Sequence, residues 1–131
     1  AIDEAEERVR FAALLDRRTE GFSQGERMKV AIARALVHDP PNVVLDEPTN
    51  GLDVMTTRSL REAVRRLRDA GKCVLFSSHV MQEVAALCDE IVIVAGGVVS
   101  AAGTPAALLE AAGCEDLEEA FVALAGAGPA P

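Results

Sequence analysis

Two adjacent carboxylates, Asp46 and Glu47, follow a short apolar run in the stretch VVLDEPTNGLD. The run is β-branched and bounded by breakers, which predicts a buried strand over residues 42–46. Near a phosphate, a carboxylate at such a strand end can hold Mg²⁺, often through water, and a second one can orient or deprotonate an attacking water. Taken alone, the pair is at least as well explained as an ordinary acidic strand end.

A second stretch, FSQGE, covers Phe22 to Glu26 and precedes a helix predicted over residues 23–37. Ser23 and Glu26 have the spacing of a capping box, which accounts for both residues structurally. The same helix start would expose backbone N–H groups, and Gly25 would let an anion approach closely. Because capping boxes far outnumber phosphate sites, this stretch in isolation also favours the structural interpretation.

A histidine, His79, follows a second buried strand predicted over residues 72–78. A lone histidine is most often a core or surface residue. Ligands of parallel sheets bind beyond the carboxyl ends of the strands, and His79 and the Asp46-Glu47 pair both follow such ends. His79 is therefore positioned to hydrogen-bond a terminal phosphate.

The remaining pattern alternates helical and extended segments. Further helices are expected over residues 3–18, 54–69, 80–88, 104–112 and 115–125, and a hairpin over residues 91–95 and 98–102 with Gly96-Gly97 at its turn. The tail over residues 125–131 is expected to be disordered. Apolar strands alternating with helices predict an α/β layered fold with a mostly parallel sheet.

Composition narrows the class of protein. The 131 residues carry a formal charge of −8, which argues against nucleic acid as a partner. The cysteines Cys73, Cys88 and Cys114 are odd in number and widely spaced, so reduced thiols are expected rather than a disulfide framework or a zinc site. No apolar run approaches the length of a membrane span.

Read in order, the segments resemble the second half of an ATP-binding cassette (ABC) ATPase. FSQGE resembles the ABC signature, usually LSGGQ; NVVLDEP resembles the Walker B strand and the glutamate after it. NGLD (Asn50–Asp53) resembles the D-loop, and SSH ending at His79 the switch histidine. Each motif is weak alone, but four in the family's order are highly specific, and the likeness covers nearly the whole chain.

The resemblance implies a role for each site residue. Asp46 would help to hold Mg²⁺, Glu47 would activate the water that attacks the γ-phosphate of ATP, and His79 would contact that phosphate. Five further residues would act across a head-to-tail dimer on the ATP of the opposite subunit: Ser23, Gln24, Gly25 and Glu26 of the signature, and Asp53 of the D-loop.

The chain also departs from the family pattern. Gln24 stands where the signature has its first glycine, Glu26 replaces glutamine and Phe22 replaces leucine. No G-x-x-x-x-G-K-[ST] loop occurs in the sequence, although the family places that loop before the signature. The expected fold is therefore a partial P-loop NTPase-type fold without its N-terminal P-loop portion, and the chain alone is expected to be inactive.

The resemblance implies three regions. Residues 1–38 would end the helical subdomain and form the signature helix, residues 39–103 would form the α/β core with Walker B, D-loop and switch histidine, and residues 104–131 would form C-terminal helices and the tail.

The function expected of the complete protein is that of an ABC transporter ATPase. ATP binding and hydrolysis would drive export through transmembrane permease partners, with the ATPase in the cytoplasm on the inner face of the membrane. The stretch HDPPNVVLDEPTNGLDVMTTR is similar to bacterial sodium and drug exporter ATPases. Two alternatives stay open: a non-transport ABC-type ATPase of chromosomes or DNA repair, and a natural truncated regulatory module without catalysis.

Overall fold

The computed structural model describes residues 12–14 and 16–126. The chain divides into two compact units, Ala1–His79 and Val80–Pro131, which are described separately. The three-region functional division of the sequence stays a prediction. Within the described residues, no helix is long and apolar enough to cross a membrane.

The first unit is built around the long helix α2 (Gln24–Leu36), which begins directly after Ser23. Ser23 Oγ accepts the backbone N–H of Glu26 at 3.2 Å, and Glu26 Oε2 accepts the N–H of Ser23 at 2.7 Å. The predicted capping box is thus confirmed, and it satisfies donors that a helix start leaves without intrahelical partners.

A strand–helix–strand unit follows α2. Strand β1 (Asn42–Leu45) leads to helix α3 (Val54–Asp69), which leads to strand β2 (Cys73–Phe76). The two strands pair in parallel, from Asn42 opposite Cys73 to Leu45 opposite Phe76. The parallel pairing and the helix predicted over residues 54–69 are therefore confirmed, whereas both strands are shorter than predicted.

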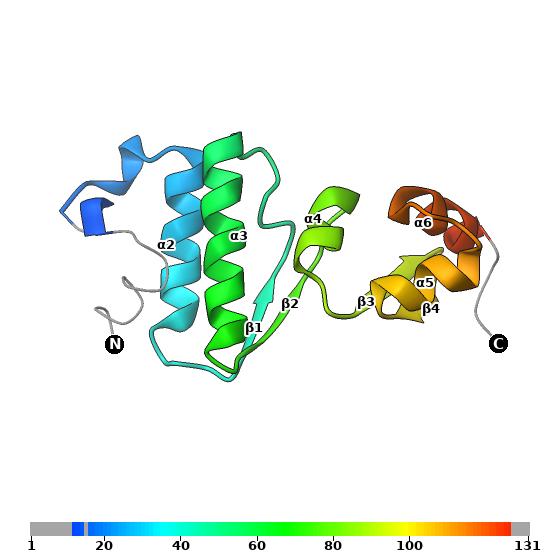
Figure 1. Cartoon of the computed structure of the whole chain (residues 1–131). Helices are drawn as coiled ribbons and strands as arrows, with labels where there is room; N and C mark the ends of the chain where they lie inside the picture. The colour runs from blue at the N-terminus through cyan, green and yellow to red at the C-terminus, as the bar shows by residue number, and fades with distance from the viewer. Residues whose placement is uncertain (1–11, 15, 127–131) are drawn as a thin grey trace. The chain divides into compact units, whose positions relative to one another are not determined.

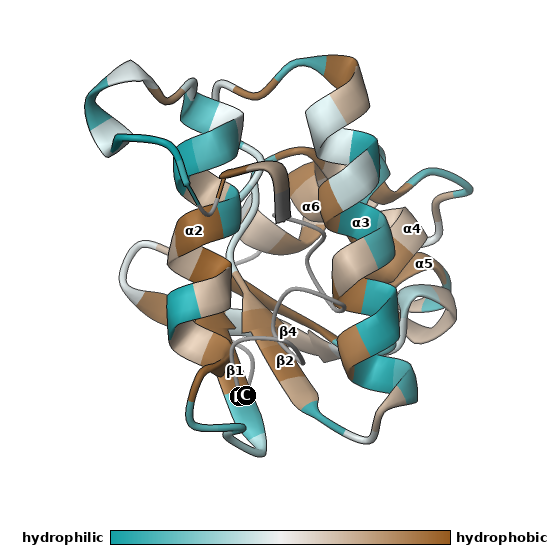
Figure 2. Cartoon of the chain, turned by 90° about the vertical axis from the view of Figure 1, so that its left-hand side faces the viewer, coloured by the Kyte–Doolittle hydropathy of each residue, from teal (hydrophilic) through white to brown (hydrophobic). Residues whose placement is uncertain are grey.

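Helices α2 and α3 cover the same face of the β1–β2 pair (Figures 1 and 2). The buried side chains of α2, α3 and β1 form the core of this unit: Ile32, Ala33, Leu36, Val43, Leu45, Leu60, Ala63, Val64 and Leu67. On the uncovered face, Val44 and Leu75 are exposed. Apart from Asn42 at the start of β1, the strands are brown in Figure 2, as expected for strands with apolar residues on both faces.

The helix predicted over residues 3–18 is wrong where the structure describes it. Residues 12–14 form a single 3₁₀ turn, η1 (Ala12–Leu14), and residues 16 and 17 are a turn and a bend. The N–H of Arg17 bonds the carbonyl of Leu14 at 3.1 Å, three residues back, which closes the turn instead of extending a helix. The rest of the predicted range, residues 3–11 and 15, lies outside the described residues.

A second 3₁₀ turn, η2 (Thr19–Gly21), leads to Phe22. Phe22 is buried, and the guanidinium carbon of Arg17 lies 5.3 Å from the centre of its ring. This cation–π contact connects the segment before the signature to the start of α2.

The second unit contains a short helix, a hairpin and two helices. Helix α4 (Met81–Leu87) precedes the antiparallel strands β3 (Ile91–Ala95) and β4 (Val98–Gly103), which helices α5 (Pro105–Ala112) and α6 (Leu117–Gly126) follow. Gly96 and Gly97 connect the strands with φ of 57° and 81°, a left-handed pair that glycine adopts at little cost. The predicted hairpin is confirmed. Of the tail expected to be disordered, residues 125 and 126 belong to α6, and residues 127–131 lie outside the described residues.

Candidate functional site

The parallel pairing brings Ser77 beside Asp46 and Glu47. Ser77 N–H continues the ladder by bonding the carbonyl of Leu45 at 3.0 Å, so the chain leaves both strands at the same level. Ser77 Oγ donates to Asp46 Oδ1 at 2.6 Å and accepts the backbone N–H of Glu47 at 2.8 Å. One hydroxyl therefore fixes both members of the acidic pair.

The backbone of Glu47 is left-handed, with φ of 44°. This region is uncommon for a residue with a long side chain and costs on the order of 1 kcal/mol, and such residues cluster at functional sites. Two contacts hold Glu47 in place, because its N–H is bonded to Ser77 and its carbonyl accepts the N–H of Asn50 at 3.1 Å. The turn places the Glu47 carboxylate within hydrogen-bonding reach of His79.

His79 is brought to the Glu47 carboxylate. Its Nδ1 lies 3.0 Å from Glu47 Oε2 and 3.2 Å from Oε1. An ionised carboxylate only accepts hydrogen bonds, so this contact requires the proton on Nδ1. The side chain of His79 is 71% exposed, which leaves the outer part of its ring accessible to a ligand.

The signature segment (Phe22–Glu26) is held by the capping box and by Arg17. The guanidinium Nη1 of Arg17 lies 2.6 Å from Glu26 Oε1, and both side chains are partly exposed. Hydrogen bonding from the backbone N–H of Ser23, with Arg17 second, lowers the pKa of Glu26. Glu26 is therefore an anion that both partners neutralise in part, rather than a free negative charge beside Ser23.

The D-loop segment (Asn50–Asp53) contacts the start of α2. Gln24 Nε2 donates to the carbonyl of Asn50 at 2.9 Å. Asp53 caps α3, with Oδ1 accepting the N–H of Thr56 at 2.8 Å and Oδ2 accepting the Thr56 hydroxyl at 3.0 Å. The backbone N–H of Thr56 is the main cause that lowers the pKa of Asp53, and the Thr56 hydroxyl is the next.

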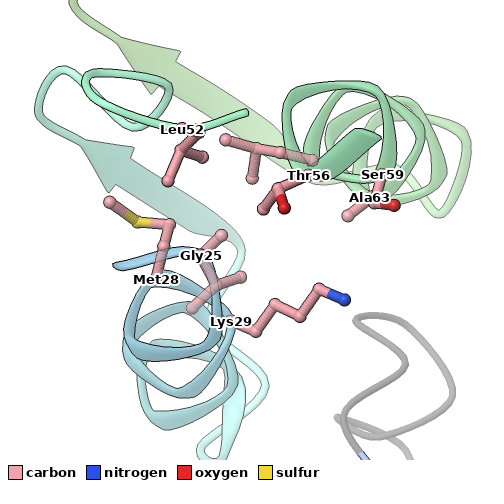
Figure 3. A pocket seen from close by; sticks show the side chains of 9 residues that line it. Gly25, Met28, Lys29, Leu52, Thr56, Ser59 and Ala63 are labelled. Carbon is pink, nitrogen blue, oxygen red and sulfur yellow. The ribbon is translucent and has the colours of Figure 1, made fainter. Parts of the chain in front are cut away.

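A shallow groove lies between α2 and α3, next to these segments. Figure 3 shows Gly25, Met28 and Lys29 of α2 opposite Thr56, Ser59 and Ala63 of α3, with Leu52 of the D-loop segment at one end. Its lining is mostly apolar apart from the Lys29 ammonium and the hydroxyls of Thr56 and Ser59.

The structure gathers the predicted site residues into two groups. Asp46, Glu47 and His79 lie at the ends of β1 and β2, joined by Ser77 and by one another. Ser23, Gln24, Gly25 and Glu26 lie at the start of α2, where Gln24 contacts the segment that ends in Asp53 and Gly25 faces Thr56 of α3.

Two contributors were missed from the sequence, Ser77 as the link between the carboxylates and Thr56 as the partner of Asp53. The register of a parallel pair could have placed Ser77 beside Asp46. Asp53 followed three residues later by Thr56 is the spacing of an N-cap contact, which could have indicated Thr56.

The strand ends have the donor chemistry of a magnesium site. Asp46 offers an exposed carboxylate and Ser77 a hydroxyl, both hard oxygen donors. The described residues hold no group of three or more metal-binding side chains. Mg²⁺ is commonly held by one or two carboxylates together with waters and substrate phosphates.

Comparison with known proteins identifies the class. A family model described as ABC transporter matches residues 1–50. A solved structure titled as the ATP-binding subunit of an ABC transporter superposes with a TM-score of 0.80 at 30% sequence identity, covering 94% of this chain and 52% of that one. The α/β fold class is thereby confirmed, and the chain belongs to the ABC transporter ATP-binding protein family.

The individual relatives include an ABC transporter ATP-binding protein and an export ATP-binding protein. The chain is 43% identical to the ABC transporter ATP-binding protein NatA of Bacillus subtilis (strain 168), over 92% of this chain and 49% of that protein. It is 37% identical to the Nod factor export ATP-binding protein I of Neorhizobium galegae, over 84% of this chain and 32% of that protein. The chain thus spans about half the length of NatA and a third of the Nod factor export protein.

Proposed function

We propose that this chain contributes the hydrolytic half of an ATP site to an ABC-type ATPase. Asp46 helps to hold Mg²⁺, Glu47 takes a proton from the attacking water, and His79 hydrogen-bonds the γ-phosphate. The observation that supports this assignment most is the cluster of Asp46, Ser77, Glu47 and His79. Ser77 Oγ bonds the Asp46 carboxylate at 2.6 Å and the backbone N–H of Glu47 at 2.8 Å, and His79 Nδ1 lies 3.0 Å from the Glu47 carboxylate.

The two carboxylates have different tasks because their surroundings differ. Asp46 is exposed at the strand end and accepts the Ser77 hydroxyl, a position suited to a cation and its waters. Glu47 turns away on a left-handed backbone and meets the His79 ring. When bound, Mg²⁺ would neutralise charge that develops on the phosphate oxygens.

The position of the proton on the His79 ring determines which hydrogen bonds the ring can make. When the Nδ1–H group of His79 donates to the Glu47 carboxylate, Nε2 of a neutral ring carries no proton and can only accept a hydrogen bond. Donation from Nε2 to a phosphate oxygen requires the imidazolium form or release of the ring from Glu47. In either case, a phosphate beside His79 changes the contact between His79 and Glu47, by which the ring would report its presence.

The second group acts on another subunit's nucleotide. Ser23 and Gly25 at the start of α2, with Gln24 and Glu26 beside them, would meet the phosphates of ATP held by a partner in a head-to-tail dimer. The backbone N–H groups and dipole at this helix start favour an anion. Asp53 would lie at the same dimer interface.

We propose that residues outside this sequence supply the phosphate-cradling loop, because no G-x-x-x-x-G-K-[ST] motif occurs within it. We therefore propose that the complete protein works as a dimer. The dimer binds transmembrane permease subunits on the inner face of the membrane, and ATP hydrolysis drives export through them. Similarity to NatA and to a Nod factor export protein supports transport over a chromosome or repair role.

Calorimetric titration of Mg-ATP tests the division of the site. The complete protein that carries this sequence is expected to bind Mg-ATP, whereas the 131 residues alone should show no tight binding and no hydrolysis. Tight, stoichiometric ATP binding to the 131-residue chain would contradict the proposal. A circular dichroism spectrum of the 131-residue chain, recorded on the same sample, verifies that the titrated chain is folded.

A further inference from the structure

Gln24 connects the signature segment to the D-loop segment, although 26 residues separate it from Asn50. Its Nε2 donates to the carbonyl of Asn50 at 2.9 Å. The family pattern has glycine at this position, and glycine has no side chain with which to make the bond. The contact is therefore a property of this sequence rather than of the signature motif.

Gly51 has no side chain, and this leaves the space that the Gln24 side chain occupies. Gly51 has φ of 71°, and a Cβ built there would lie 2.8 Å from Nε2 and 2.9 Å from Oε1 of Gln24. The amide group of Gln24 thus occupies the space that any larger residue at position 51 would need. The hydrogen bond and the close packing act on the same turn.

A second contact ties the other end of the D-loop segment to α2. A Cβ at Gly25 would lie 2.5 Å from Thr56 Cγ2, so the start of α2 rests directly on the first turn of α3. Thr56 is in turn bonded twice to Asp53. The D-loop segment is consequently held against α2 at both of its ends.

We propose that Gln24 is a positioning residue that fastens the D-loop segment to the signature helix, so that both elements meet the partner's ATP as one body. This inference rests on the proposed function, in which both elements act across the dimer. A turn that is ordered beforehand loses less conformational freedom when the dimer closes on ATP. Removal of the Gln24 contact should therefore weaken ATP-dependent closure and spare the chemistry at Glu47.

The first test measures the contact itself and needs no activity. In the complete protein, Gln24→Met keeps the side-chain length and removes the donor. Amide hydrogen exchange is followed at Asn50 and Leu52, whose N–H groups bond the carbonyls of Glu47 and Thr49 within the turn. Exchange should accelerate about three- to tenfold, the factor that corresponds to one neutral hydrogen bond. The control Gln82→Met, an exposed glutamine of α4, should leave both amides unchanged.

The second test separates positioning from chemistry. Gln24→Met should raise the KM for ATP about three- to tenfold and leave kcat within about twofold, at an unchanged melting temperature. Unchanged exchange at Asn50 and Leu52, an unchanged KM, or a fall in kcat with KM preserved would each overturn the inference. Failure of the proposed function itself would appear elsewhere, as ATP turnover that survives Glu47→Gln, and the exchange experiment would still judge the contact.

Discussion

His79 Nδ1 lies 3.0 Å from Glu47 Oε2. This contact connects a residue that follows strand β1 with a residue that follows the parallel strand β2. The contact is formed across 32 positions of sequence, and it exists because β1 and β2 end at the same level. The fold of the chain itself thus pairs the proposed base, Glu47, with the residue proposed to contact the phosphate, His79.

Ser77→Ala should loosen both carboxylates at once. The variant loses the bond to Asp46 Oδ1 and the bond from the N–H of Glu47, which lies on a left-handed backbone. Because Ser77 is exposed and water can replace part of the loss, we expect a cost of about 1 kcal/mol in the free energy of unfolding. ATP turnover by the complete protein should fall about tenfold, since the Glu47 side chain is no longer fixed.

Ser77→Thr provides the matched control, because threonine keeps the hydroxyl and suits the end of a strand. It should retain most of the turnover that Ser77→Ala loses. Equal turnover in wild type and Ser77→Ala, measured by phosphate release, would show that the Ser77 hydroxyl does not organise the site.

Gly25→Ala should destabilise the first unit through overpacking. The new Cβ would lie 2.5 Å from Thr56 Cγ2, so the Thr56 side chain or the helices that carry the two residues would have to shift. Overpacking of this kind costs about 1–3 kcal/mol, measured as the free energy of unfolding in urea. Gly21→Ala is the control, since a Cβ at Gly21 meets nothing within 4 Å.

A double variant identifies the cause. Thr56→Ser removes the methyl group and keeps the hydroxyl that bonds Asp53. In the Thr56→Ser background, the penalty of Gly25→Ala should shrink. An undiminished penalty would mean that the clash with Thr56 is not its source.

Acid should weaken the start of α2. The Ser23 N–H and Arg17 lower the pKa of Glu26 in the folded chain, so the folded state binds the Glu26 proton less readily than the unfolded state does. The stabilisation by Glu26 is therefore complete above the unfolded value, about 4.3, and is lost as the pH falls through the lower folded value.

The comparison of wild type with Glu26→Gln measures this effect. Urea unfolding between about pH 3 and pH 7 should show a stability difference that is largest near neutrality and shrinks below about pH 4. Glu20→Gln, at an exposed position in η2, serves as the control. A difference between wild type and Glu26→Gln that is independent of pH would contradict the assignment of the capping role to the charged carboxylate.

Local signals in the sequence predicted the elements well where one physical cause dominates. The capping box at Ser23 marked the start of α2, and the helix predicted over residues 54–69 is α3, which buries Leu60, Ala63, Val64 and Leu67. The Gly96-Gly97 pair marked the hairpin turn. Each of these signals lies within a few residues of the structure that it determines.

Contacts between distant segments were harder to predict. Ser77 acts on Asp46 and Glu47 only through the register of β1 and β2, and Gln24 reaches Asn50 only because α2 and α3 cover one face of the strands. The helix predicted over residues 3–18 failed in its described part because periodicity alone does not reveal a 3₁₀ turn closed by Arg17. The roles of the site residues themselves stay predictions.

Glu47→Gln in the complete protein tests the central claim most directly. The amide keeps the size of the side chain and removes the base, so Mg-ATP binding measured by calorimetry should be preserved while phosphate release falls by at least about a hundredfold. Glu110→Gln, at an exposed position in α5, should change neither quantity. Turnover of Glu47→Gln at the wild-type rate would contradict the assignment of Glu47 as the base that activates water.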